Sequence, residues 1–140
     1  MKVLLDTSIL IDLYLNGEQS PAYTMVESLP ADALFVSVIS LGKIINRLST
    51  LKNPERKADL DAWVQNIERR YQQHILPVDQ NVVRFWGEMS AKVQAQGQAL
   101  SMADGLVAAT AHSQGLYVMT RNTDAFEAAG VFLINPWDTV

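Results

Sequence analysis

Short apolar runs alternate along this chain with longer segments in which apolar residues recur at helical spacing, and this alternation restricts the fold more than any other feature. The runs expected to form strands are residues 2–5, 33–38, 75–78, 116–120 and 131–134. Most consecutive runs are separated by helical segments, so the strands should pair in parallel. The sequence therefore predicts an α/β fold, with a parallel sheet of about five strands and helices on both faces.

Residues that favour helix ends bracket the segments between these runs. Thr7 or Ser8 can cap a helix that ends near residue 15, and Ser40 can cap another that ends near residue 51. Pro54 suits the first turn of a helix that continues to about residue 72. Ser101 can cap a helix to residue 114, and further helices are expected at 23–29 and from 79 or 81 to 96.

Length and composition are those of one ordinary globular domain. The chain has 140 residues, of which 49% are apolar and 19% are charged. Cysteine is absent, which excludes disulfides, thiolate zinc sites and a cysteine nucleophile. No apolar run approaches the about 20 residues of a membrane helix, and Asp6 and Asp12 interrupt the N-terminal apolar run. We expect a single domain over residues 1–140, located in the cytoplasm and not in contact with a membrane.

The charge balance gives the chain no overall attraction to nucleic acid. Eleven basic and 15 acidic residues leave a net charge of −4. The basic residues nevertheless gather in two regions of the sequence, namely Arg47, Lys52, Arg56 and Lys57, followed by Arg69 and Arg70. These clusters are either solvated helix faces or local phosphate contacts.

Three aspartates stand where apolar runs give way to polar turns or helix starts: Asp6, Asp104 and Asp124. In an open parallel sheet the ligand site lies beyond the carboxyl ends of the strands, which is where Asp6 and Asp124 fall. Asp104 lies in the first helical turn after Ser101, which should bring it to the same edge. Carboxylates are the ligands that Mg²⁺ prefers, and one or two suffice when waters and phosphate oxygens complete the shell.

Some of these positions also have a purely structural explanation. Asp104 completes a Ser-x-x-Asp pattern close to a capping box, and Asp124 can be a polar loop residue. Asp6 is harder to explain in this way, because a buried carboxylate without partners costs several kcal/mol. Arg121 and Asn122 either contact phosphates, order Asp124, or are simply loop residues.

Lys43 breaks the local pattern. It stands three residues after Ser40, where a capping glutamate is favoured and where the helix dipole disfavours a cation by about 0.3–1 kcal/mol. Exceptions of this kind are typical of functional sites. The ammonium group either enters the acidic pocket and pairs with Asp6 or Asp104, or turns outward into water.

Four motifs together resemble the PIN-domain ribonucleases, and among them the VapC-like toxins of bacterial toxin–antitoxin pairs. The motifs are residues 4–10, 37–42, 103–111 and 120–126, followed by residues 135–137. The resemblance covers the whole chain in order. Each motif alone is weak, and the set is specific.

The resemblance implies a Mg²⁺- or Mn²⁺-dependent endoribonuclease with a PIN-like fold that cuts structured RNA such as tRNA or rRNA. It also implies neutralisation by a cognate antitoxin and a homodimer, which would hide apolar residues including Ile44, Ile45 and Leu48. Asp6 and Asp104 match the family's metal-binding aspartates, and Asp124 is a further catalytic candidate. The candidate RNA contacts are Thr7, Ser8, Arg121 and Asn122.

Two departures from the family pattern bear on activity. Lys43 occupies the position of the family's glutamate, and Ala125 occupies the position of an acid, with Asp124 one residue early. An ammonium beside two carboxylates would pair with them and compete with the metal. The alternative to an impaired nuclease is therefore a disabled protein of the same fold that only binds antitoxin or RNA.

Two other enzyme classes with strand-end aspartates fit poorly. A receiver-type phosphoacceptor needs an acidic pair beside the aspartate and a late lysine at a strand end. A haloacid-dehalogenase-like phosphatase needs Asp-x-Asp after the first strand, whereas Asp6-Thr7-Ser8 lacks the second acid.

Overall fold

The computed structural model describes residues 1–138 and contains one five-stranded sheet in which all strands run parallel. The strands are β1 (Val3–Leu5), β2 (Leu34–Ser37), β3 (Ile75–Leu76), β4 (Tyr117–Met119) and β5 (Leu133–Ile134). Their order across the sheet is β3-β2-β1-β4-β5, so β1 lies at the centre. The predicted α/β class and the number of strands are confirmed.

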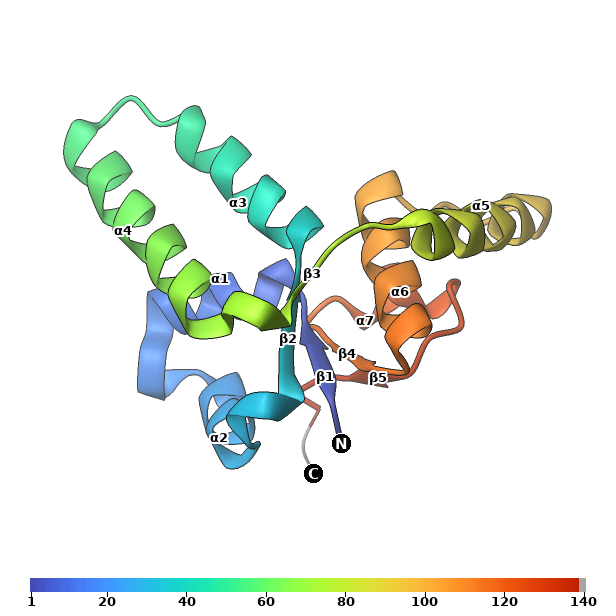
Figure 1. The fold of residues 1–140 in the computed structure, drawn as a ribbon, viewed down its shortest axis with the longest axis horizontal. Coiled ribbons are helices and arrows are strands. Elements are labelled where there is room, and N and C mark those ends of the chain that lie inside the picture. Colours follow the sequence, from blue (N-terminus) through green and yellow to red (C-terminus); the bar gives the residue numbers. More distant parts are fainter. Residues whose placement is uncertain (139–140) are drawn as a thin grey trace.

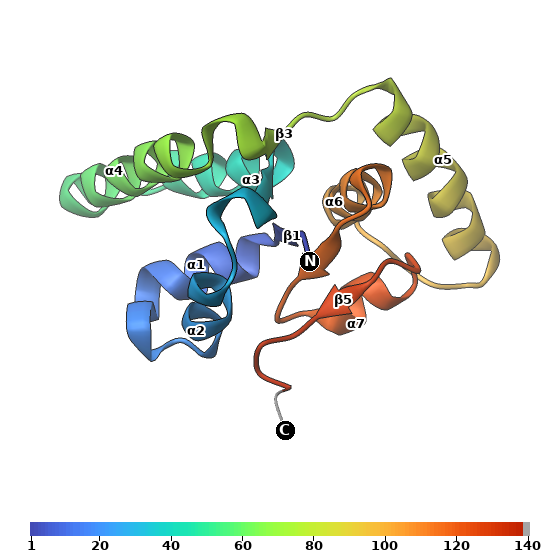
Figure 2. The ribbon, with the colours of Figure 1, turned by 60° about the horizontal axis from the view of Figure 1, so that its bottom comes forward.

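Helices cover both faces of this sheet (Figures 1 and 2). They are α1 (Thr7–Asn16), α2 (Pro21–Ser28), α3 (Val38–Ser49), α4 (Pro54–Tyr71), α5 (Gln80–Ala95), α6 (Met102–Gln114) and α7 (Thr123–Glu127). Short 3-10 turns occur at Gly17–Gln19, Ala31–Ala33 and Gln72–His74. Within the described residues, no helix combines the length and the apolar character that crossing a membrane requires.

Alternation along the central strand divides the core into two layers. Val3 and Leu5 pack with buried residues of α1 to α4, whereas Leu4 packs with buried residues of α5 to α7. All three side chains are fully buried. Because successive side chains of a strand point to opposite faces, an unbroken apolar run is what a strand covered on both sides requires.

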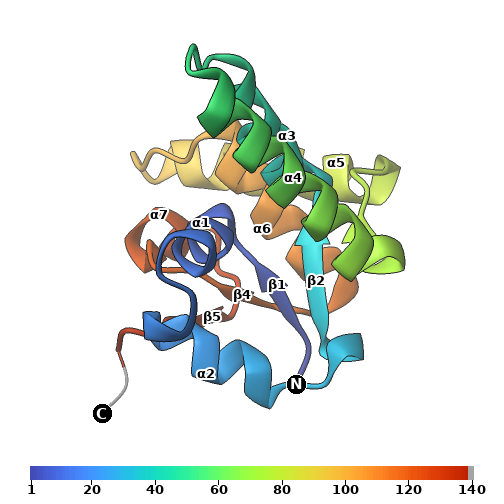
Figure 3. The ribbon, with the colours of Figure 1, turned by 90° about the vertical axis from the view of Figure 1, so that its left-hand side faces the viewer.

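Helices α3 and α4 form an antiparallel hairpin that extends from the carboxyl end of β2 (Figure 3). Pro54 occupies the first turn of α4, and the Asn53 side chain caps this turn by accepting hydrogen bonds from the backbone N–H groups of Glu55 and Arg56. The hairpin packs beside α1 through Ile44, Leu48 and Val64, which are all buried. It therefore forms one wall of the region at the carboxyl edge of the sheet.

Two of the predicted helix caps are wrong. Helix α3 is capped by Ser37, whose Oγ accepts a hydrogen bond from the backbone N–H of Ile39 at 3.0 Å, and not by Ser40. Ser37 ends β2 with an extended backbone, so the helix begins without an intervening loop. Helix α1 likewise begins directly after Asp6, rather than at a cap formed by Thr7 or Ser8.

A side chain at Gly105 of α6 is expected to be destabilising. A Cβ atom there would lie 2.9 Å from Cδ1 and Nε1 of the Trp86 ring on α5, closer than real Cβ contacts. We expect Gly105→Ala to lower the free energy of unfolding by about 1–3 kcal/mol, the usual cost of overpacking. Urea denaturation measures this loss.

Gly87→Ala is the matched control, because a Cβ atom on Gly87 would meet nothing within 4 Å. This substitution should leave stability unchanged or raise it by up to about 1 kcal/mol, since alanine reduces the entropy of the unfolded chain. Equal effects of the two substitutions would contradict the close packing of α6 against Trp86.

Candidate active site

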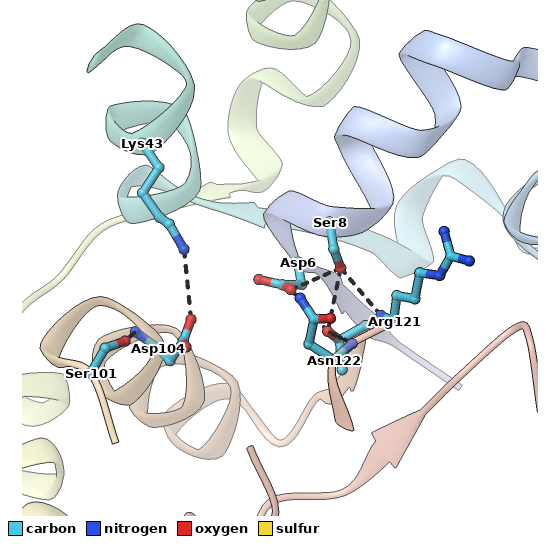
Figure 4. Close-up of polar contacts among 8 residues, drawn as sticks. Asp6, Ser8, Lys43, Ser101, Asp104, Arg121 and Asn122 are labelled. Carbon is cyan, nitrogen blue, oxygen red and sulfur yellow. Dashed lines mark hydrogen bonds and ion pairs between the residues drawn. The ribbon is translucent and has the colours of Figure 1, made fainter. Parts of the chain in front are cut away.

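Asp6 is a buried carboxylate held at the carboxyl end of the central strand. It follows β1 directly, and the residue is only 4% exposed. Its Oδ2 accepts hydrogen bonds from Thr120 Oγ1 at 2.9 Å and from Ser8 Oγ at 3.0 Å (Figure 4). Thr120 follows β4, which pairs with β1, so strand pairing itself brings this hydroxyl to Asp6.

The second oxygen of Asp6 has no such partner. Within residues 1–138, Oδ1 of Asp6 is buried and accepts no hydrogen bond. Leaving a buried charged oxygen unsatisfied is costly, so such groups are retained where a ligand or ion completes them. This oxygen is therefore suited to bind a cation.

The turn after β4 is tied to the start of α1 by further hydrogen bonds. The backbone N–H of Arg121 donates to Ser8 Oγ at 3.2 Å, and that of Asn122 donates to Thr120 Oγ1 at 3.0 Å. The structure thus brings Ser8 and the backbone of Arg121 and Asn122 close to Asp6, and their role in RNA binding stays a prediction. Thr7, the residue after Asp6 in the sequence, is also buried, and within residues 1–138 its hydroxyl has no hydrogen-bond partner.

Asp104 and Lys43 form an ion pair on the other side of the site. Ser101 caps α6 by accepting a hydrogen bond from the backbone N–H of Asp104 at 3.1 Å. The Asp104 carboxylate is thereby left free to meet Lys43, whose Nζ lies 3.6 Å from Asp104 Oδ1. The predicted pairing of Lys43 with one of the two aspartates is confirmed, and the partner is Asp104.

The position of Lys43 in its helix differs from the prediction. Because Val38 is the first residue of α3, Lys43 lies in the second turn, and the predicted penalty from the helix dipole does not apply there. Ser40 is fully buried, and within the described residues its hydroxyl has no hydrogen-bond partner. The Lys43 side chain is 42% exposed and that of Asp104 is 22% exposed, so the pair is open to water.

Asp6 and Asp104 stand at the same edge of the fold. Figure 4 shows the Asp6 carboxylate directed toward the side on which Lys43 and Asp104 meet. Among residues 1–138, no group of three or more histidine, aspartate or glutamate side chains is placed to hold a metal ion. A cation at this edge would therefore depend on the two carboxylates, as the sequence analysis expected, and their sharing of one ion stays a prediction.

Asp124 is not linked to the other acidic residues. It is exposed in the first turn of α7, and within the described residues no hydrogen bond or ion pair joins it to Asp6 or Asp104. Its catalytic role stays a prediction.

Asp12 is a buried acid that sequence reasoning did not assign to the site. It accepts a hydrogen bond from Asn16 Nδ2 at 2.8 Å, and its Oδ1 lies 3.9 Å from Arg121 Nη1. The Arg121 guanidinium also lies over the ring of Trp137, 4.5 Å from its centroid. An acid inside an apolar helical segment was the available signal, and its partner Arg121 could not be read from the sequence.

Comparison with known proteins places these residues in a described family. Residues 3–131 match the family model of the PIN domain. Toxin FitB of Neisseria gonorrhoeae is 29% identical over 96% of this chain and 98% of that protein. The tRNA(fMet)-specific endonuclease VapC of Shigella flexneri is 27% identical, over 98% of each protein.

The fold is shared with a solved structure over nearly the whole chain. The crystal structure of FitAcB from Neisseria gonorrhoeae superimposes with a TM-score of 0.88 and 29% sequence identity. The match covers 98% of this chain and 99% of that one.

Proposed function

Because the chain belongs to the PIN-domain family, we propose that it is a metal-dependent endoribonuclease toxin that cuts structured RNA such as tRNA or rRNA. The observation that carries this proposal is the Asp6 carboxylate. Two hydroxyl groups fix one of its oxygens, and the other is buried without a hydrogen-bond partner among residues 1–138. The relatives named as a toxin and as a tRNA endonuclease support the class of activity. We further propose that residues 1–140 form one domain, act in the cytoplasm and are neutralised by a cognate antitoxin.

The residues present fit a single hard cation. Asp6 and Asp104 would hold Mg²⁺ or Mn²⁺, for which one or two carboxylates are a sufficient protein contribution. Such an ion, when bound, lowers the pKa of a coordinated water and neutralises charge that develops on the phosphate. The chain's own contribution is orientation, because Ser8 and Thr120 fix Asp6 and the cap at Ser101 fixes the first turn that carries Asp104.

RNA would be positioned by polar groups at the start of α1 and in the turn after β4. Arg121 is exposed and anchored by Asp12 and Trp137, which leaves its guanidinium in reach of solvent and of a phosphate. Thr7, Ser8 and Asn122 supply polar groups from the start of α1 and the turn after β4. Phosphate contacts of this kind make binding weaker as salt rises.

Lys43 is proposed to impair this site without destroying it. Its ammonium neutralises part of the charge that Asp104 would offer to a cation. An exposed ion pair contributes only about 0.2–1 kcal/mol, so a metal ion in excess can displace it. We therefore expect slow cleavage that needs a high Mn²⁺ concentration.

The proposal is tested by incubating the purified chain with tRNA and rRNA, in Mn²⁺ and in EDTA. Cleavage at defined positions in Mn²⁺, absent in EDTA and absent for Asp6→Asn, is the expected result. Cleavage that persists in EDTA or in Asp6→Asn would come from a contaminant or another site.

A second candidate function is a disabled protein of the same fold that only binds antitoxin or RNA. The ion pair of Lys43 with Asp104 and the apolar Ala125 favour it. No cleavage at any Mn²⁺ concentration, together with intact RNA or antitoxin binding, would select this alternative.

Self-association is expected through the exposed face of α3. The sequence analysis expected a dimer to hide Ile44 and Leu48, but both are already buried in the core of the single chain. Val38 and Ile45 are instead the apolar residues that α3 exposes, at 38% and 43%. Val38 and Ile45 lie two turns apart on one face of α3. We propose a twofold homodimer that covers this face, and Ile45→Glu should convert it to a monomer.

Light scattering at micromolar concentration measures the mass of both proteins. The substitution Lys52→Glu, on an exposed residue between α3 and α4, controls for the added negative charge. A monomeric mass for the unmodified chain would contradict the dimer.

A further inference from the structure

A cavity of about 190 Å³ opens between α1, α3 and α4 beside the candidate active site. It shares Thr7 and Lys43 with that site, and its remaining walls come from the outer part of the α3–α4 hairpin and from α1. Whatever occupies the cavity therefore continues directly into the region of Asp6 and Asp104.

Positive charge dominates this cavity. Lys43, Arg47 and Arg56 line it, and no aspartate or glutamate among residues 1–138 does. Lys43 is paired with Asp104 outside the cavity, so Arg47 and Arg56 carry most of the charge that the cavity offers to a ligand. Lys43 and Arg47 stand one turn apart on α3, and Arg56 faces them from the first turns of α4. In a chain whose net charge is −4, this is a local attraction for a polyanion.

The rest of the lining is apolar and aromatic. Trp63 of α4 stacks against Tyr14 of α1, with ring centroids 4.5 Å apart, and both rings line the cavity. The rest of the apolar surface comes from Ile11, Leu15, Ile44, Leu48 and Leu60. A cavity with cations at its rim and an aromatic wall matches the two parts of a nucleotide, namely a phosphate and a base.

We propose that this cavity binds one unpaired nucleotide of the RNA, adjacent to the phosphate that is cut. The proposal rests on the proposed ribonuclease function, and it adds a contact for the base of one nucleotide beside the target phosphate. A base within an A-form helix is stacked and paired, so it cannot pack against Trp63. A peptide segment of a partner protein is the other conceivable occupant, and two arginines with no carboxylate among the described lining residues favour the nucleotide.

Binding of a short fluorescent single-stranded RNA, measured by anisotropy in EDTA, tests the cavity without requiring cleavage. The double variant Arg47→Ala/Arg56→Ala should bind the RNA at least about tenfold more weakly. The slope of log K against the logarithm of the salt concentration should become shallower by about 1.4, or about 0.7 for each lost phosphate contact. Lys57→Ala is the control, because Lys57 is exposed on α4 next to Arg56 and does not line the cavity.

Trp63→Leu tests the base. The affinity of this variant for the single-stranded RNA should fall by at least about 5-fold, the factor that corresponds to the lower end of base–aromatic stacking energies. The slope of log K against the logarithm of the salt concentration should stay unchanged, because no phosphate contact is lost. A duplex of the same sequence should be unaffected by Trp63→Leu, because its bases cannot enter the cavity, and should lose less affinity than the single strand in the double arginine variant. If Trp63→Leu fails to fold, as judged by thermal denaturation, the arginine variants and the duplex comparison still decide the outcome.

Failure of this inference is separable from failure of the proposed function. If the chain cleaves RNA but the cavity variants bind single-stranded RNA as Lys57→Ala does, the cavity is not a nucleotide site. The same conclusion follows if the variants lose only the binding of a partner protein. If the chain never cleaves RNA but binds it through the cavity, the nucleotide site stands and the catalytic proposal falls.

Discussion

Replacing Lys43 with glutamate is expected to tighten Mn²⁺ binding by more than about tenfold. The change removes one basic residue of 11 and adds one acidic residue to 15, so the net charge moves from −4 to 10 − 16 = −6. It also removes the ammonium that lies 3.6 Å from Asp104 and supplies a third carboxylate at the same edge. Isothermal titration calorimetry with Mn²⁺ measures the difference.

The size of the effect separates two causes. The exposed pair of Lys43 with Asp104 is worth at most about 1 kcal/mol, which corresponds to about 5-fold in affinity. Lys43→Met removes the pair without adding a ligand, so it should recover no more than about this factor. The remainder of the gain in Lys43→Glu would come from the added carboxylate.

Lys52→Glu controls for net charge. It makes the same change of two units on an exposed residue between α3 and α4. Its Mn²⁺ affinity should stay within about twofold of the unmodified chain, because charges more than a Debye length of about 8–10 Å apart are screened. Equal gains in Lys43→Glu and Lys52→Glu would place Lys43 outside the metal site.

Asp6→Asn is expected to abolish cleavage without destabilising the fold. Loss of groups that merely orient a metal ligand costs about 10- to 100-fold, so loss of the ligand itself should cost more than about 100-fold. The amide oxygen can still accept the hydrogen bonds from Ser8 and Thr120, which preserves the local structure. The variant is best examined in the Lys43→Glu background, where we expect the highest activity.

Asp6→Asn should not lower the stability of the metal-free protein, although it removes activity. In metal-free buffer Asp6 carries a buried oxygen with no hydrogen-bond partner within the described residues, which costs about 1–3 kcal/mol. Replacing this charge with a neutral amide should leave the free energy of unfolding unchanged or raise it by up to about that amount. Urea denaturation in EDTA measures it, and a loss of stability larger than about 1 kcal/mol would show that Asp6 is structural.

The sequence was sufficient to predict the fold because apolar runs and helical segments alternate over the whole chain. The five strands, their parallel arrangement and the family resemblance are confirmed. Helix α7 was missed, since five residues carry too little periodicity to separate a helix from a loop. The cap of α3 was misplaced because Ser37 and Ser40 are equally good caps locally, and the length of β2 decides between them.

The site was predictable only in part, because the sequence shows local signals but not which distant residues meet. Asp6 and Asp104 carry local signals, namely an acid after a buried strand and an acid after a helix cap. Their partners are distant in the sequence. Thr120 reaches Asp6 only because β4 pairs with β1, and Arg121, the next residue after Thr120, reaches Asp12 of α1 for the same reason. Only the folded chain shows that Lys43 pairs with Asp104, and that Asp6 Oδ1 has no hydrogen-bond partner in the part of the chain that the structure describes.

The most direct measurement is the single-turnover rate of tRNA cleavage as a function of Mn²⁺ concentration, for the unmodified chain and for Lys43→Glu. If Asp6 and Asp104 form a metal-dependent ribonuclease site that Lys43 suppresses, Lys43→Glu will cleave faster and reach its maximal rate at lower Mn²⁺. Superimposable curves, or no cleavage by either protein at any Mn²⁺ concentration, would contradict that assignment.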